Sequence, residues 1–489
     1  MYKVVIGLEV HCELETKSKN FSPAPNMFTE SHNINVGTVD LGLPGILPVA
    51  NKEAARRALL TAMALHCKTP DEVIFDRKNY YYPDLPKGYQ ITQNTKPMGT
   101  NGYLDILVNN HVKRVAIHDL HLEEDTASLE HYPKYSLIDY NRSGIPLMEI
   151  VTEPCMESAD EAVTFLEDLR DVFLYLGVSE AKSNYGQMRC DVNISLMKET
   201  DTELGTKVEM KNINAFNNVR AAIEYEIKRQ SEILNKGEKV VQETRRIAED
   251  GKTYSMRAKV DAVDYKYFIE PNIPSTPVTD DLLYELKSKL PELKLDRYFK
   301  YIEKLGISEY DAAILSKERS LSDYFEEVIS YGSDVALTVN FTTTAILSTL
   351  NKLEIKINEL FITPKMLSGV INYVNEGKMS LDAAKKLLYK AIDEKIDPNE
   401  LIKKESLVQI NDSDKLLSLI NECMQENKEV VRQYVEEGNK SAINFFVGQV
   451  MKKSNRQANP NKSRELITEE LERRCKWWIK DIEHITVLN

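Results

Sequence analysis

The sequence predicts an α+β protein in which a strand-rich first part is followed by a helical second part. Up to about residue 290, short segments that alternate apolar and polar residues are separated by turns rich in Gly, Pro and Asn. After Pro274 the chain becomes rich in Leu, Lys and Glu, with apolar residues at helical spacing. Of the 489 residues, 42% are hydrophobic and 28% are charged, a globular composition with material for about three domains.

Two helices are predicted within the strand-rich part. The first begins after Ser158, which together with Glu161 has the spacing of a capping box, and it ends at Gly177. The second carries Phe216 and further apolar residues at helical spacing, and it ends near Gly237.

In the second part, polar breaks separate shorter helical segments. Helical spacing is clear in Asp280–Lys289, Leu381–Ile392 and Lys415–Met424. The pattern predicts a helical middle and a small helical tail.

Composition disfavours membrane and secreted classes. No run of about 18 apolar residues is present, so no membrane span is expected. Met1–Val5 enters a strand pattern at once and lacks the pattern of a signal peptide. Six scattered cysteines without CxxC spacing are typical of a reduced, cytoplasmic protein without a disulfide framework or a zinc knuckle.

Charge alone leaves the binding of nucleic acid open. The formal net charge is −13, yet ten Lys and Arg residues and only four Glu residues lie between Lys440 and Lys480. A basic end on an acidic chain fits local contact with RNA. A solvated helical surface has the same composition.

Three predicted strands each carry their polar residues on one face. In Val4–Leu14 the even-numbered residues are apolar, whereas the odd-numbered ones include Glu9, His11 and Glu13. The same alternation gives the other two strands their polar faces: Arg189, Asp191, Asn193 and Ser195 in one, and Lys207, Glu209 and Lys211 in the other. If the strands share a sheet, they form a floor of carboxylates flanked by cations, which suits Mg²⁺ and phosphate. Each strand by itself is also compatible with an ordinary solvated outer face.

Two further acidic segments can join this floor. Leu120–Asp125 places three acids at the end of a strand-like run, and the alternative is an exposed acidic turn. Glu149 lies in an apolar run, where a carboxylate needs a metal or a partner, such as a salt bridge to Arg142 or Arg189.

Common catalytic motifs are missing from the sequence. It contains no GxxxxGK[ST] phosphate loop, no protein-kinase motif set and no GxSxG nucleophile elbow. Cys190 lies on the apolar face of its strand and is expected in the core. Any ATP chemistry must therefore use an unusual site, and no glutaminase nucleophile is visible.

Several longer strings resemble the GatB family, the B subunits of tRNA-dependent amidotransferases. They cover nearly the whole chain in family order, ending around Arg474: Ile6–His11, Leu43–Pro48, Asp76–Tyr80, Leu120–Asp125, Pro146–Glu149, Arg189–Ser195, Gly205–Asn212, Gln242–Arg245, Asp264–Phe268 and Val447–Met451.

The resemblance implies three domains. These are an N-terminal cradle of antiparallel β-sheets with helices over 1–290, a helical domain over 291–400, and a small helical tail resembling YqeY proteins over 401–475. Residues 476–489, with Trp477 and Trp478, lie outside the family pattern.

The resemblance also implies an activity. Members of the family work in a heterotrimer with an amidase, which hydrolyses glutamine, and a small third protein known as the C subunit. The GatB protein phosphorylates the side-chain carboxylate of Glu-tRNA(Gln) or Asp-tRNA(Asn) with ATP and Mg²⁺, and ammonia from the amidase then forms the amide. The expected protein is a cytoplasmic carbon–nitrogen ligase with glutamine as the amide donor.

Carried over by position, the resemblance assigns roles to particular residues. The metal set is Glu9, His11, Glu124 and Glu149, and Asp191, Asn193 and Glu209 are expected around ATP. Arg189, Lys207 and Lys211 are our own candidates for contacts to phosphate or carboxylate, beside Glu124 and Glu149 as catalytic residues. In the tail, Lys452, Lys453 and Arg456 are expected near tRNA.

Some positions depart from the family pattern. Gln187 replaces a usual serine, Ile269 replaces a usual proline, Asn340 begins a segment that usually has Trp next, and the cysteines that some members use for zinc are absent around Asp40. These departures raise the alternative of a tRNA-binding scaffold with reduced phosphotransfer. A metal-dependent phosphodiesterase acting on RNA requires only the acid cluster and is a third hypothesis.

Overall fold

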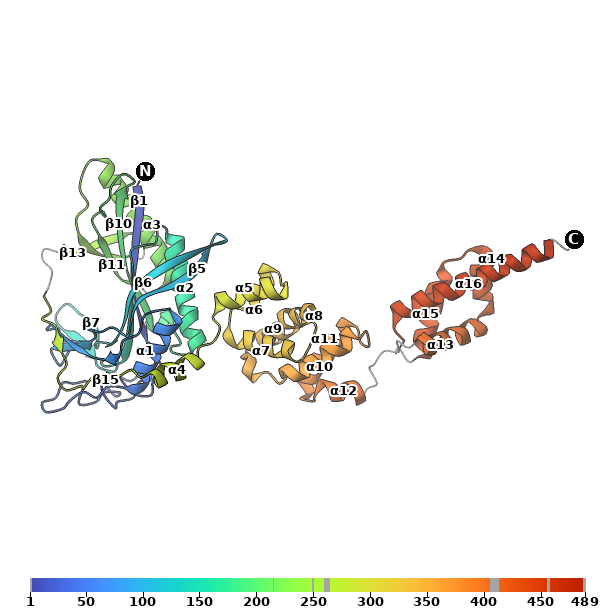
Figure 1. The fold of residues 1–489 in the computed structure, drawn as a ribbon, viewed down its shortest axis with the longest axis horizontal. Coiled ribbons are helices and arrows are strands. Elements are labelled where there is room, and N and C mark those ends of the chain that lie inside the picture. The colour runs from blue at the N-terminus through green and yellow to red at the C-terminus, as the bar shows by residue number, and fades with distance from the viewer. Residues whose placement is uncertain are drawn as a thin grey trace. The chain divides into compact units, whose positions relative to one another are not determined.

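The computed structural model describes residues 2–213, 215–248, 250–258, 264–404, 413–454 and 458–486. The chain divides into two compact units, Met1–Arg297 and Tyr298–Asn489. The first contains all the β-sheets and the second contains helices only in its described part (Figure 1). The predicted α+β class is therefore confirmed.

An eight-stranded sheet is the centre of the first unit. Its strand order is β13-β12-β11-β10-β1-β9-β6-β5. The strands are β1 (Tyr2–Glu13), β5 (Gly99–Val108), β6 (His111–Glu124), β9 (Pro146–Thr152), β10 (Met188–Lys198), β11 (Val208–Ile213), β12 (Glu243–Ile247) and β13 (Thr253–Ala258). Neighbours are antiparallel except for the parallel pair of β11 and β12. Strand β1 lies between β9 and β10, so residues on its polar face have neighbours on both sides.

Smaller sheets and five helical segments complete this unit. The small sheets pair β14 (Phe268–Ile269), β3 (Asp76–Asn79) and β4 (Tyr89–Thr92), then β15 (Thr276–Pro277) with β2 (Glu72–Val73), and β7 (Ser128–His131) with β8 (Ser136–Asp139). The helices are α1 (Lys52–Ala64), α2 (Ala159–Leu176), α3 (Phe216–Asn235), α4 (Asp280–Ser288) and the 3₁₀ turn η1 (Ser183–Tyr185).

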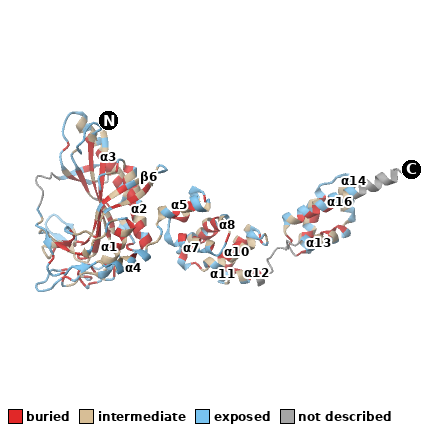
Figure 2. Cartoon of the chain, viewed as in Figure 1, coloured by how far each residue is buried: buried red, intermediate tan, exposed pale blue. Residues whose placement is uncertain are grey.

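The core lies between the apolar face of the large sheet and helices α1, α2 and α3 (Figure 2). The predicted alternation in β1 is confirmed, since Ile6, Leu8 and Val10 are almost completely buried. The two predicted helices are confirmed as α2 and α3. Ser158 caps α2 by accepting a hydrogen bond from Glu161 N, but the Glu161 carboxylate accepts from Glu157 N instead of Ser158 N.

The second unit consists of helices around separate small cores. Its first helices, from α5 at the boundary, are α5 (Lys294–Leu305), α6 (Glu309–Leu315), α7 (Arg319–Ser330), α8 (Val335–Asn340), η2 (Phe341–Ile346), α9 (Leu347–Leu353), η3 (Ile357–Glu359), α10 (Pro364–Asn375), α11 (Leu381–Glu394) and α12 (Pro398–Lys404). They enclose two cores. After residues 405–412 come α13 (Ser413–Glu426), α14 (Lys428–Glu437), α15 (Ser441–Lys453) and α16 (Pro460–Thr486), which share a third core.

Two features of the helices concern expectations from the sequence. The segment η2 that follows Asn340 is a π-helix, which the helical spacing of its residues did not predict. Across the described ranges, none of the helices combines the length and the apolar character needed to cross a membrane.

A buried ionic network fixes the edge of the large sheet formed by β12 and β13 to α3. The carboxylate of Glu226, which is completely buried, accepts hydrogen bonds from Arg229 and Thr253 and lies 3.1 Å from Arg245 Nε. Arg245 in turn donates to the hydroxyl and the carbonyl of Thr253. Because Arg245 is on β12 and Thr253 on β13, one carboxylate holds both strands against the helix.

Replacing Glu226 with alanine is expected to lower the free energy of unfolding by about 3–5 kcal/mol, because it removes the buried carboxylate that Arg229, Thr253 and Arg245 share and leaves Arg245 with Glu243 as its remaining acid partner. Urea denaturation measures this, and Glu224→Ala, an exposed position on the same helix, should change it by less than about 0.5 kcal/mol. Burial would raise the pKa of Glu226, but hydrogen bonds from Arg229 and Thr253 lower it. The Glu226 contribution should therefore be complete above the unfolded-state pKa of about 4.3 and disappear as the pH falls through the lower folded-state value. Equal stability of the two variants would contradict this account.

Candidate functional site

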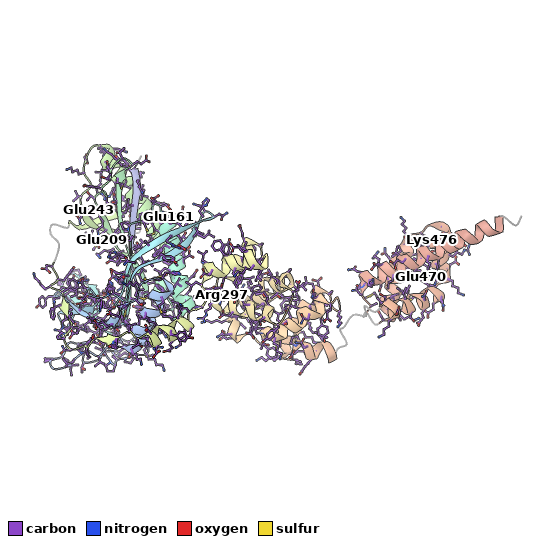
Figure 3. All side chains as sticks on the ribbon, viewed as in Figure 1. Glu161, Glu209, Glu243, Arg297, Glu470 and Lys476 are labelled. Carbon is purple, nitrogen blue, oxygen red and sulfur yellow. The ribbon has the colours of Figure 1, made fainter. Side chains whose placement is uncertain are left out.

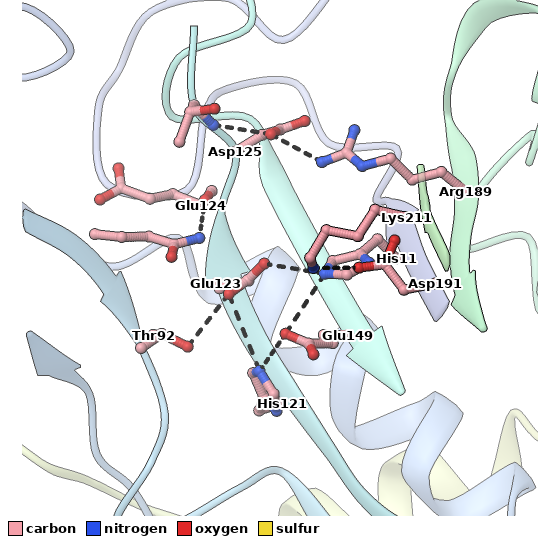
Figure 4. A network of polar contacts seen from close by, with 12 residues as sticks. His11, Thr92, His121, Glu123, Glu124, Asp125, Glu149, Arg189, Asp191 and Lys211 are labelled. Carbon is pink, nitrogen blue, oxygen red and sulfur yellow. Dashed lines mark hydrogen bonds and ion pairs between the residues drawn. The ribbon is translucent and has the colours of Figure 1, made fainter. Parts of the chain in front are cut away.

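Polar residues from separate strands share one face of the eight-stranded sheet. Pairing places Glu9 opposite Asp191 and His11 opposite Arg189 on one side of β1. On its other side, His11 is opposite Glu149 of β9. Because paired residues point to the same face, these side chains converge although they are distant in the sequence. Figure 4 shows four of them, His11, Glu149, Arg189 and Asp191. The predicted polar floor is present.

His11, Glu123 and Glu149 form a first group of potential cation ligands. One ligand atom from each lies within 4.8 Å of the others. His11 Nε2 lies 3.6 Å from Glu149 Oε2 and 3.9 Å from Glu123 Oε1. His121 Nε2 lies 2.8 Å from the same Glu149 oxygen. Two imidazoles therefore face two almost completely buried carboxylates.

The imidazoles and carboxylates of this first group control one another's charge. Burial raises the pKa of Glu123, and the neighbouring Glu149 adds to that shift. Burial would also raise the pKa of Glu149, but His121 and His11 hold it well below its usual range. Burial favours neutral His121, yet Glu149 and Asp119 bring its pKa well above the usual value. The acids therefore depend on nearby positive charge, which is also what a divalent cation provides.

Glu9, Asp191 and Glu209 form a second group, again with ligand atoms within 4.8 Å of one another. Lys211 Nζ lies 2.6 Å from Asp191 Oδ2 and 3.0 Å from Glu209 Oε1. Burial raises the pKa of Glu9 to about 8, helped by Glu149 and Asp191. Burial lowers the pKa of Lys211, but Asp191 and Glu209 raise it by more. Lys211 therefore supplies positive charge among these closely spaced carboxylates.

An arginine site borders the first group. Arg189 Nη2 lies 2.9 Å from Asp125 Oδ1, and Arg142 Nε lies 3.5 Å from Asp125 Oδ2. Burial raises the pKa of Glu13, on the same face, to about 7, which Asp125 increases and both arginines oppose. Two guanidinium groups beside cation ligands are a suitable environment for phosphate or carboxylate oxygens.

Glu124, predicted in the metal set, lies in a different environment. Its carboxylate is 2.5 Å from Lys87 Nζ and accepts a hydrogen bond from Ile91 N at 2.9 Å. The structure brings its neighbour Glu123 to His11 and Glu149 instead. The physical reason is strand alternation, because Glu123 and Glu124 are consecutive residues of β6 and point to opposite sides.

The other predicted residues divide between the site and its edge. Asn193 lies on β10 opposite Glu209, and its Oδ1 is buried without a hydrogen-bond partner in the described part of the chain. Lys207 is exposed, immediately before β11. Asp191, Glu209 and Lys211 are brought together as expected from their strand positions.

Three site residues were not singled out from the sequence. His121 and Glu123 alternate with Leu120 and Leu122, the same pattern that identified the polar face of β1, so this signal was available. Lys78 comes from the separate strand β3. Burial lowers the pKa of Lys78, but Glu123, Tyr267 and Glu149 raise it by more, so its charge interacts with both carboxylates of the first group. The sequence held no signal for that interaction.

Cys190 lies in the core of the first unit, and the basic tail residues belong to the second unit. Cys190 is buried in the core as expected, and burial raises the pKa of its thiol far above the usual value. In the tail, Lys452 is exposed, and Lys453 Nζ lies 3.0 Å from Glu422 and 2.7 Å from Glu426. Arg456 lies outside the described residues.

Together, the fold and the site define a protein with oxygen-rich ligand groups and cationic side chains on one sheet face, followed by all-helical segments. Such a face suits divalent cations and the oxygens of phosphates. Comparison with known proteins identifies the family. A family model described as the GatB/GatE catalytic domain matches residues 4–284, and one described as the GatB domain matches residues 323–471. The chain belongs to the GatB family.

Individual relatives cover almost the whole chain. The B subunit of an aspartyl/glutamyl-tRNA(Asn/Gln) amidotransferase from a Staphylococcus species is 43% identical over 474 residues, which are 97% of this chain and 100% of the relative. Proteins of the same name from Staphylococcus aureus strains JH9 and Newman are 44% identical over the same length. The similarity therefore extends through both the sheet-containing unit and the helical unit.

Proposed function

We propose that this chain is the component of a tRNA-dependent amidotransferase that activates the side-chain carboxylate of Glu-tRNA(Gln), Asp-tRNA(Asn) or both. Its relatives' name gives these aminoacyl-tRNAs as the class of substrate. The observation that carries the proposal is the convergence of two ligand groups on one sheet face, next to Arg189 and Lys211. Family membership favours this function over the scaffold alternative.

The reaction needs an activation step because a carboxylate is a poor electrophile. A side-chain carboxylate oxygen of the aminoacyl group attacks the γ-phosphorus of ATP, and the bond to the bridging oxygen breaks to release ADP. Ammonia then attacks the carbonyl carbon of the acyl phosphate. Inorganic phosphate leaves, one proton is lost, and the amide remains.

The residues of the floor fit binding sites for Mg²⁺. Hard oxygen ligands with a single imidazole are a donor set that Mg²⁺ accepts, and the acids are crowded enough to require a cation. His11, Glu123 and Glu149 would hold one ion, and Glu9, Asp191 and Glu209 a second. Bound there, Mg²⁺ neutralises phosphate charge and aligns the triphosphate.

The cationic side chains have separate roles in this proposal. Lys211 and Arg189 lie among the acids, where they can bind phosphate oxygens or the substrate carboxylate. Lys207, exposed before β11, and Asn193, with its unsatisfied Oδ1, would contact ATP. Glu124, paired with Lys87, is proposed to act beside the cation groups and not as a ligand in them.

The proposed activity requires partners and places the chain in the cytoplasm. No cysteine or serine nucleophile for glutamine hydrolysis was found in the sequence, so ammonia must come from a separate amidase, with the small C subunit completing the complex. In the proposed domain organisation, 1–290 binds ATP and the tRNA acceptor end, 291–400 is a helical connection, and 401–475 binds tRNA. Residues 476–489 form an extension.

The proposed function is tested by phosphate release from ATP in the assembled complex with charged tRNA. The wild-type complex is expected to release phosphate only when Glu-tRNA(Gln) or Asp-tRNA(Asn) is present. Lys211→Ala should lower kcat by about 100-fold, because it removes a preorganised positive charge from the site. Lys113→Ala, which breaks a pair with Glu161 away from the site, is the matched control. The proposal would be contradicted if the wild-type complex released phosphate without tRNA, or released none with charged tRNA.

The affinity for a divalent cation is expected to depend on Glu149 and not on Glu124. Glu149→Gln should weaken binding of Mn²⁺, used as a probe for Mg²⁺, by at least about 10-fold, because it removes a carboxylate from the first group. Glu124→Gln should leave the affinity almost unchanged, since its carboxylate pairs with Lys87. Electron paramagnetic resonance of free Mn²⁺ measures both. Equal losses in the two variants would mean that Glu124 is a ligand after all.

The tail residues differ in their expected contribution to tRNA binding. Lys452→Ala should weaken tRNA affinity and reduce the slope of log K against log salt by about one, as expected for a lost phosphate contact. Lys453→Ala should have the smaller effect, because Glu422 and Glu426 already balance its charge. Filter binding over a range of salt concentrations measures the slopes. If Lys452→Ala leaves the slope unchanged, Lys452 does not contact a tRNA phosphate and this surface is merely exposed to solvent.

A further inference from the structure

The string Gln242–Arg245 is a family-like motif to which the proposed function assigns no role. It enters β12, which forms with β11 the one parallel pair among the described strands of the large sheet. This pairing sets Thr244 directly opposite Glu209 of β11, a member of the second ligand group. Figure 3 labels Glu209 and Glu243, which belong to these two neighbouring strands. The motif is therefore next to the site.

The hydroxyl of Thr244 holds one specific oxygen of Glu209. Thr244 is 2% exposed, and its Oγ1 donates a hydrogen bond of 3.0 Å to Glu209 Oε2. The other oxygen, Oε1, lies 3.0 Å from Lys211 Nζ, which also lies 2.6 Å from Asp191 Oδ2. The two oxygens of Glu209 thus have different partners, so the orientation of the carboxylate plane is fixed from both sides.

Thr244 is itself fixed by the buried network on the other face of its strand. Successive residues of a strand point to opposite faces, so Thr244 faces Glu209 while Arg245 faces α3. There Arg245 lies 3.1 Å from the Glu226 carboxylate and donates hydrogen bonds to Thr253. A hydroxyl on a strand anchored in this way has little freedom to turn away from its acceptor. The buried network around Glu226 is therefore connected to the second ligand group through β12 and the side chain of Thr244.

We infer that Thr244 is the positioning residue that orients Glu209 as a ligand for a divalent cation in the second group. This inference rests on the proposed function. The partners of metal ligands determine ligand orientation, and losing one typically costs about 10–100-fold in metal affinity. Without the hydroxyl, the Glu209 carboxylate can rotate about its terminal bond, and its alignment with Glu9 and Asp191 is lost. The role belongs to the hydroxyl and not to the shape of the side chain.

The experiment is a Mn²⁺ titration of the full chain in its assembled complex, followed by electron paramagnetic resonance of the free ion. Thr244→Val keeps the volume but removes the donor, and it should weaken one class of site by about 10–100-fold. Sites formed by His11, Glu123 and Glu149 should keep their affinity, which gives an internal control. Thr244→Ser restores the hydroxyl and should bind Mn²⁺ within about threefold of the wild type.

A kinetic readout separates positioning from a general loss of structure. In tRNA-dependent ATP cleavage, Thr244→Val should raise the Mg²⁺ concentration needed for half-maximal rate by about 10–100-fold and should lower the rate at saturating Mg²⁺ much less. Thr61→Val is the matched control, because Thr61 is a completely buried threonine of α1 that bonds to Arg57 O away from the site. It should leave the Mg²⁺ dependence unchanged.

Two results would count against this role of Thr244. Unchanged Mn²⁺ affinity in Thr244→Val would overturn the inference, as would a Thr244→Ser variant that is folded and as weak as Thr244→Val. A wild-type complex that binds no Mn²⁺ would instead overturn the proposed function, on which the inference rests. The thermal unfolding midpoint of each variant shows whether it has folded.

Discussion

The central constraint on this structure is the repulsion among carboxylates that share one buried sheet face. Glu123, Glu149, Asp191 and Glu209 are each less than 10% exposed, and like charges at this spacing cannot all remain ionised without neighbouring cations. The protein meets this requirement with His11 and the adjacent His121 at the first group and with Lys211 beside the second. The face is therefore arranged to hold positive charge, which these side chains supply and which the proposed Mg²⁺ ions would add.

The fold maintains this arrangement by supporting the crowded strands from behind. The apolar residues of β1 pack against α1, α2 and α3, which fixes the register that brings distant acids together. At the edge formed by β12 and β13, the Glu226 carboxylate holds these two strands to α3 and so presents Thr244 to Glu209. A polar floor on a rigid sheet loses little energy to reorganisation when charge develops during phosphoryl transfer. The buried ionic network and the chemistry of the face are thus parts of one structure.

Residue alternation made much of the site predictable. Period-two patterns identified Glu9 and His11 on β1, Asp191 on β10, and Glu209 with Lys211 on β11, because side chains of a strand point to alternate faces. The prediction of Glu124 as a metal ligand came from position in a family motif and not from this alternation, and the structure places Glu123 there instead. Applying the same alternation to His121 and Leu122 would have selected Glu123. The domain boundaries and the roles of the tail residues stay predictions.

The sequence by itself determined which strands have a polar face, the presence of α2 and α3 but not of α1, and the family to which the chain belongs. These properties depend on local periodicity and on strings of adjacent residues, which one chain displays directly. Only the tertiary structure decided that Lys78 of a second sheet interacts with Glu123, that Lys87 pairs with Glu124, and that Thr244 orients Glu209. Such contacts depend on the strand order and register of a non-local sheet, and no local pattern encodes the partner of a strand.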